Sequence, residues 1–182
     1  MPYPARDNAR AVAPAIAVGL IAVLAMARSP VVVATLGRGW GSQACLVFLL
    51  VMAAPLLGRT VGTLGLFGAA NAVTTVRAVI AAIVGGCVGR SVPPSVLWGI
   101  EGLVITFAVL DGVDGWLART RGLASAFGAR FDMETDAAFI LVLSLLVWEH
   151  EGAGVWVLLC GLMRYAFVAA GWLLPWLSAP LR

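Results

Sequence analysis

The sequence predicts an all-α protein, a polytopic transmembrane helical bundle of about six spans. Hydrophobic residues make up 62% of the 182 residues, 12% are charged, and the mean hydropathy is +1.00. An average soluble domain is roughly half apolar and about a quarter charged, and one soluble core of this length cannot bury so much apolar surface. The composition excludes a secreted disulfide scaffold, a nucleic-acid-binding domain and a disordered chain.

Six candidate spans follow from hydropathy and from the positions of glycine, proline and arginine. They are residues 11–35, 42–58, 71–89, 94–118, 131–149 and 152–176. The first contains Arg28-Ser29-Pro30, where we expect it to end early or kink. Residues 59–70 are amphipathic and glycine-rich, which is typical of a juxtamembrane helix. The chain then divides into 1–70, two N-terminal spans with the juxtamembrane segment, and 71–182, with four spans.

The arginines predict that both termini are cytoplasmic. With the N-terminus inside, seven loop or terminal arginines fall on the cytoplasmic side and two on the other, and such a bias is typical of membrane proteins. The seven are Arg6, Arg10, Arg59, Arg119, Arg121, Arg130 and Arg182, and the two are Arg38 and Arg90. We expect a multi-pass protein of a bacterial inner membrane, with residues 119–130 at the cytoplasmic face.

Six of the nine acids lie between positions 101 and 136, although acids beside membrane spans are energetically costly. Asp111 and Asp114 are spaced i,i+3, and Asp132 and Asp136 are spaced i,i+4, so each pair shares one face of a helix. Two such pairs joined by a short loop form a four-carboxylate cage. All-oxygen ligands suit Mg²⁺ or Mn²⁺, and two such ions are a common device for in-line phosphoryl transfer.

Neighbouring residues fit a phosphate ligand. Gly115 and Gly128 lie four residues from an aspartate, on the acid-bearing faces, where the missing side chain lets a ligand approach the backbone. Arg119 suits phosphate oxygens with its forked guanidinium. The simpler alternative is a structural role, with Asp111 and Asp132 paired to Arg119 and Arg130.

Residues 111–136, DGVDGWLARTRGLASAFGARFDMETD, resemble the signature of the CDP-alcohol phosphatidyltransferase family. That signature reads D-x-x-D-G-x-x-A-R, eight residues, G, three residues, D, three residues, D. Every fixed position and both gap lengths match, at Asp111, Asp114, Gly115, Ala118, Arg119, Gly128, Asp132 and Asp136. A second segment, Asn71-Ala-Val-Thr74-Thr-Val-Arg77, resembles the N-x-x-T-x-x-R that opens the family's first core helix.

The resemblance implies a membrane transferase, usually a homodimer, that moves a substituted phosphoryl group from a CDP-linked donor to an alcohol and releases CMP. The four aspartates would bind two divalent cations, Mg²⁺ or Mn²⁺, and Asp136 would also be the general base. The nucleotide site would contain Asn71, Thr74, Gly115, Ala118, Arg119 and Gly128. The enzyme is expected to use CDP-diacylglycerol as the donor and a small polar alcohol as the acceptor, in phospholipid biosynthesis. Membrane lipids are expected to surround it, and no nucleic acid is expected as a partner.

One departure from the family concerns the number of spans. The family core usually continues for six spans from the N-x-x-T-x-x-R helix, whereas only four predicted spans begin at or after Asn71 here. Either the two N-terminal spans replace the last two core helices, or the chain lacks a C-terminal part.

Arg164 lies in the middle of a predicted span, which is a costly position for a charge. It is a candidate ligand for an anionic acceptor such as glycerol 3-phosphate or an inositol phosphate, with Arg121 and Arg130 as further candidates; the alternative is a structural pair with an acid. Glu134 has no fixed role in the signature. The Glu149-His150-Glu151 cluster is interpreted as a solvated turn rather than a metal site.

Three other functions stay open. A CDP-choline or CDP-ethanolamine phosphotransferase would use diacylglycerol as the acceptor. An intramembrane prenyltransferase also uses two aspartate-rich motifs and Mg²⁺, but its motifs are usually far apart in sequence. A divalent-cation carrier would be expected to bind its ion near the midplane of the membrane.

Overall fold

The computed structural model describes residues 6–57, 69–120 and 125–174. All regular elements of these ranges are helices, which confirms the all-α class. They are α1 (Arg6–Ala27), α2 (Pro30–Leu36), α3 (Gly39–Ala53), the 3₁₀ turn η1 (Ala54–Leu57), α4 (Ala69–Gly85), α5 (Pro94–Thr120), α6 (Ala126–His150), the 3₁₀ turn η3 (Val155–Val157) and α7 (Leu158–Leu173).

Each of the six predicted spans coincides with a helix, and the first is broken where proline predicts it. α1 ends at Ala27 and α2 begins at Pro30, and the two axes differ by 71°. Pro30 occupies the first turn of α2, where a missing N–H costs no helical hydrogen bond. The predicted juxtamembrane helix lies almost entirely in 58–68, outside the described residues.

By length and hydropathy, residues Pro94–Leu117 of α5 are a candidate membrane span. The bent pair α1 and α2 qualifies only if both helices are counted as one span. Three further apolar helices, Gly39–Ala53, Ala70–Gly85 and Val155–Gly171, are shorter than a full span. Within the described residues, length and composition thus support one membrane-crossing helix, or two if the bent pair is one span, and the six predicted spans are not confirmed.

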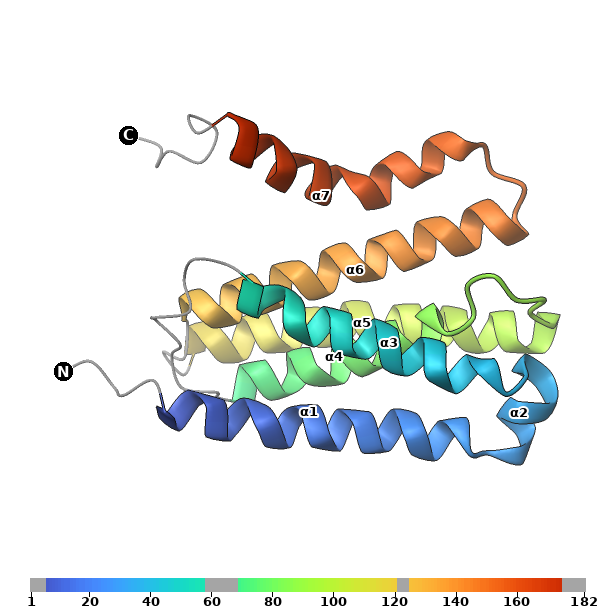
Figure 1. Ribbon diagram of the computed structural model, residues 1–182, viewed down its shortest axis with the longest axis horizontal. Helices are drawn as coiled ribbons and strands as arrows, with labels where there is room; N and C mark the ends of the chain where they lie inside the picture. The colour runs from blue at the N-terminus through green and yellow to red at the C-terminus, as the bar shows by residue number, and fades with distance from the viewer. Residues whose placement is uncertain (1–5, 58–68, 121–124, 175–182) are drawn as a thin grey trace.

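Helix α4 is the centre of the bundle, because α1, α3, α5 and α6 all pack against it. Its inner face carries small residues, among them the fully buried Ala78, Ala81 and Ala82, which allow neighbouring helices to approach closely. A β-carbon at Gly85 would lie 3.0 Å from Val47 of α3, so the end of α4 is equally tight. Helix α7, in contrast, packs mainly on α6 and diverges from the other helices (Figure 1).

The last turn of α5 and the first turn of α6 lie at one end of the bundle, together with the start of α1 and the end of α7 (Figure 1, left). α6 begins at Ala126, five residues before the predicted span, because Ser125 caps it: its hydroxyl accepts a hydrogen bond from the Gly128 N–H at 2.9 Å. This cap fixes the helix that carries Asp132 and Asp136.

Candidate active site

The four predicted aspartates come together between α5 and α6, beside α4. Asp111 and Asp114 lie on α5, and Asp132 and Asp136 lie on α6. The side chain of Asp114 is 6% exposed, whereas those of Asp111, Asp132 and Asp136 are between 38% and 51% exposed. The cluster thus has one buried member and three that a ligand can reach.

Arg77 of α4 lies at the centre of this cluster and is fully buried. Its Nη1 atom is 2.7 Å from Oδ2 of Asp114 and 2.5 Å from Oδ1 of Asp132. Its Nη2 atom is 2.9 Å from Oδ1 of Asp111 and also contacts Oδ1 of Asp136. Asp111 and Asp132 therefore both pair with Arg77. The structural alternative, in which these two aspartates pair with Arg119 and Arg130, is wrong.

Two further groups hold this arrangement in place. The Thr74 hydroxyl donates a hydrogen bond to Oδ2 of Asp114 at 3.1 Å, the same oxygen that Arg77 contacts. The guanidinium of Arg77 lies 4.5 Å from the centre of the Phe107 ring, which stacks on Phe139 at 3.8 Å. One helix turn of α4 and an aromatic pair below it thus position the four carboxylates.

The donor set fits a hard divalent cation. Carboxylate oxygens of Asp111, Asp114 and Asp132 lie within 4.8 Å of one another, close enough for one ion to bridge them. Each aspartate contacts Arg77 through one oxygen, and in the described ranges its second oxygen has no protein partner. Asp136 lies outside the three-residue group and joins the cluster through Arg77.

A cavity of about 200 Å³ opens directly beside the aspartates. It combines five of the six predicted nucleotide-binding residues with two of the aspartates. Its lining includes Asn71, Thr74, Gly115, Arg119 and Gly128 together with Asp114, Asp132 and Ser125. The sixth residue, Ala118, lies on α5 one turn after Asp114, and its side chain is outside the description.

The two motif glycines also lie close against neighbouring side chains. A β-carbon at Gly128 would lie 2.8 Å from Oδ1 of Asn71, and one at Gly115 would lie 3.2 Å from Nη1 of Arg119. Both contacts are shorter than ordinary van der Waals distances. The glycines therefore let the side chains of Asn71 and Arg119 lie against the helix backbones at the cavity wall.

Of the predicted acceptor residues, Arg164 and Arg130 do not line this cavity. Arg164 of α7 donates a hydrogen bond from Nη2 to Oε1 of Glu134 at 2.8 Å. Glu134 is two residues from both aspartates of α6, a rotation of roughly 200°, so it faces the opposite side of the helix. It is buried, not solvent-facing. Arg130 is half-buried on that same side, and Arg121 lies outside the described residues.

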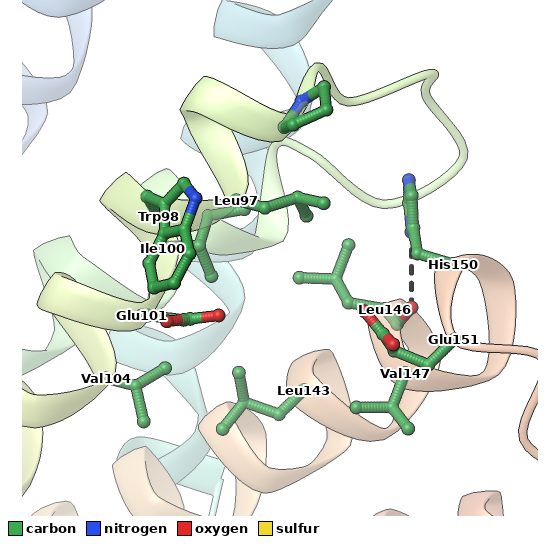
Figure 2. Close-up of a pocket in the computed structure, with 11 residues that line it drawn as sticks. Leu97, Trp98, Ile100, Glu101, Val104, Leu143, Leu146, Val147, His150 and Glu151 are labelled. Atoms are coloured by element: carbon green, nitrogen blue, oxygen red, sulfur yellow. Dashed lines mark hydrogen bonds between the residues drawn. The ribbon is translucent and has the colours of Figure 1, made fainter.

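A second cavity of about 490 Å³ lies between α5 and α6 at the opposite end of the bundle (Figure 2). Glu101 lines it together with apolar side chains such as Trp98 and Leu143. Glu101 precedes Asp111 by ten residues, roughly 15 Å along the helix. Glu101 therefore does not belong to the aspartate site.

The Glu149-His150-Glu151 segment supports the turn between α4 and α5. Oε2 of Glu149 accepts a hydrogen bond from the backbone N–H of Gly89 at 2.8 Å. Nε2 of His150 lies 3.0 Å from the carbonyl oxygen of Arg90, and Nδ1 lies 3.2 Å from that of Leu146. Both ring nitrogens and the Glu149 carboxylate thus contact backbone groups, and Glu149 and His150 form the end of α6 rather than the predicted turn.

Arg77 is the site residue that sequence reasoning missed. The sequence indicated Arg77 only as the last position of the N-x-x-T-x-x-R segment, without a role in the site. Its signal was an arginine inside an apolar span, six residues after Asn71. Ser125 was missed as well, although serine is one of the residues preferred at the N-cap of a helix.

The comparison with protein families confirms the resemblance. The model of the CDP-alcohol phosphatidyltransferase family matches residues 67–177, well over half of the chain. A search of the curated proteins and a search of the solved structures each find no match. Members of this family are membrane proteins that use a divalent metal, a CDP-linked alcohol and an alcohol acceptor. The chain belongs to the CDP-alcohol phosphatidyltransferase family and is a transferase of phosphorus-containing groups.

Proposed function

We propose that the protein transfers a phosphatidyl group from CDP-diacylglycerol to a small polar alcohol and releases CMP, as a step of phospholipid biosynthesis. The observation that carries this proposal is the continuity of the 200 Å³ cavity with the aspartate cluster. A nucleotide in the cavity would place its diphosphate beside the carboxylates, where bound cations neutralise it.

Asp111, Asp114, Asp132 and Asp136 are proposed to hold two divalent cations, Mg²⁺ or Mn²⁺. Such ions supply positive charge to the diphosphate as the CMP leaves. The second oxygens of the four carboxylates, which have no protein partner among the described residues, support this assignment.

Asp136 is proposed as the general base. Its carboxylate removes the proton from the acceptor hydroxyl while the acceptor oxygen bonds to the phosphorus that carries the diacylglycerol. The bond between this phosphorus and the CMP oxygen breaks, and the charge on CMP remains balanced by the cations. Its 39% exposure makes Asp136 reachable for an acceptor, unlike the buried Asp114.

The nucleotide is proposed to bind between α4 and the facing ends of α5 and α6. Asn71 and Thr74 would lie near the cytidine, and Gly115 and Gly128 leave room for it in the cavity wall. Ala118 is proposed as a further residue of the nucleotide site. Arg119, in the last turn of α5, is exposed and can contact a phosphate with its guanidinium.

The acceptor is proposed to be a small anionic alcohol such as glycerol 3-phosphate or an inositol phosphate, with Arg164, Arg130 and Arg121 as binding residues. The half-buried side chain of Arg164 keeps 27% of its surface exposed while it pairs with Glu134. An acceptor phosphate would share or replace that carboxylate as its partner.

In the membrane we propose six spans, with both termini and the aspartate site at the cytoplasmic face of a bacterial inner membrane. Residues 1–70 would form two spans and a juxtamembrane segment, and 71–182 the catalytic core, in a homodimer. The packing of α1 and α3 against α4 supports the idea that they take the place of two core helices.

The test is CMP release by the purified protein with CDP-diacylglycerol, Mg²⁺ or Mn²⁺ and a panel of acceptors, beside an EDTA sample and Asp136→Asn. We expect metal-dependent release with an anionic acceptor and none from the variant. Release only with CDP-choline or CDP-ethanolamine and diacylglycerol would instead show that diacylglycerol is the acceptor and not part of the donor. No release with any pair would contradict the proposal.

A further inference from the structure

We propose that Arg77 is a resident counter-ion of the metal site: it holds the four aspartates in place without metal and stays between them when the cations bind. This inference rests on the proposed metal site and adds a positioning residue to it. The alternative is that the guanidinium merely occupies the cation position and must leave when metal arrives.

The contacts of Arg77 leave room for a cation. Its two Nη atoms meet Oδ1 of Asp111, Oδ2 of Asp114, Oδ1 of Asp132 and Oδ1 of Asp136, one oxygen from each carboxylate. The remaining oxygens have no protein partner in the described segments. Each carboxylate can therefore bind the guanidinium with one oxygen and a metal ion with the other.

The surroundings of Arg77 oppose its departure. The side chain is fully buried, and the guanidinium rests on the stacked rings of Phe107 and Phe139. Among the described residues its Nε atom is buried without a hydrogen-bond partner, and its ionic contacts are all made by the two Nη atoms. Leaving would require a buried cation to cross an apolar helix interface, which is costly.

Charge explains why such a residue is useful. Four ionised carboxylates carry a charge of −4, and Arg77 reduces it to −3. Two divalent cations would then bring the site to +1, which attracts an anionic diphosphate. Without Arg77, four like charges in a partly buried site would repel one another whenever metal is absent.

The experiment is the thermal unfolding of the full chain in detergent, in EDTA and across a Mn²⁺ titration, for wild type, Arg77→Met and Arg77→Lys. In EDTA we expect Arg77→Met to unfold about 6 °C or more below wild type. Mn²⁺ should raise its Tm by more than it raises that of wild type, because the ions replace the lost charge. Arg77→Lys should lie between the two.

Arg90→Met is the matched control, because Arg90 follows α4 at its other end and bonds to the carbonyl oxygens of Leu36 and Gly86. It should lower the Tm equally with and without Mn²⁺. Adding Asp111→Asn to Arg77→Met should restore part of the loss in EDTA, since it removes one of the repelling charges.

The outcomes separate this inference from the proposed function. An unchanged Tm of Arg77→Met in EDTA, or a Mn²⁺ response equal to that of wild type, would overturn the counter-ion role. Tighter Mn²⁺ binding at undiminished stability would show that Arg77 is displaced by metal. If Mn²⁺ leaves even wild type unchanged, the metal site is wrong, and the EDTA comparison with the Asp111→Asn rescue still decides the role of Arg77.

Discussion

Asn71 and Gly128 touch across the interface of α4 and α6 so closely that a β-carbon at position 128 would lie 2.8 Å from the Asn71 Oδ1 atom. Gly128→Ala should therefore displace Asn71 from the cavity wall. Because small displacements of binding groups cost much activity, we expect kcat/KM for the CDP donor to fall by roughly tenfold to a hundredfold.

Gly112→Ala is the control for this change. Position 112 also lies within a helix, but nothing lies within 4 Å of an added β-carbon there. Its activity should be unchanged and its stability equal or slightly higher, because alanine favours helix more than glycine does. Equal kinetics for both variants, measured as CMP release against donor concentration, would argue against the close contact.

Thr74→Val removes the hydroxyl that donates to Asp114 while keeping the shape of the side chain. Loss of one hydrogen bond to a buried carboxylate is expected to cost about 1–3 kcal/mol of stability. The KM for the CDP donor should rise, since Thr74 lines the cavity. Thr106→Val, on the exposed side of α5, is the comparison that should change neither value.

Asp136→Asn and Asp132→Asn compare a proposed ligand that is also the general base with a proposed ligand that is not. Asp132 belongs to the group of oxygens within 4.8 Å of one another, and Asp136 does not. We expect Asp136→Asn to lose about 10²–10⁴-fold in CMP release and, because Asp136 lies outside the three-residue group, to lose a smaller part of the Mn²⁺-induced rise in Tm than Asp132→Asn does. Asp132→Asn should lose both, and an identical Mn²⁺ response of the two variants would contradict this division.

Arg164→Gln tests the acceptor assignment. The change leaves the buried carboxylate of Glu134 unpaired, so stability should fall by about 3–5 kcal/mol. If Arg164 binds the acceptor, the KM for an anionic acceptor rises while that for the donor does not. Glu134→Gln added to it should restore stability but not the acceptor KM. A double variant with a normal acceptor KM would reduce Arg164 to a structural residue.

Local signals predicted the helices and the aspartate motif well. Continuous apolar runs and Pro30 marked the spans and the break after α1, and fixed spacings placed Asp111, Asp114, Asp132 and Asp136 on facing helices. These features depend on neighbours within a few residues, which a sequence displays directly. The start of α6 was less accurate, because the Ser125 cap extends the helix beyond its apolar part.

Long-range partners could not be read from the sequence. The four ionic contacts of Arg77 join residues that are 34 to 59 positions apart, and no local pattern states which carboxylate an arginine will meet. The same holds for the pair of Arg164 with Glu134, which depends on how α7 lies along α6. The sequence identified the charged residues but did not indicate which arginine pairs with which carboxylate.

The contacts of Arg77 also determine how far α4 can slide along its neighbours. The helices around it are largely apolar, and burial of apolar surface is a non-directional force that does not by itself fix one axial offset. A slip by one turn, about 5.4 Å, would bring Val73 or Ala81 opposite the four carboxylates and leave them without a cation. A single guanidinium thus selects one axial alignment of α4 during assembly, as one buried polar residue does in a coiled coil.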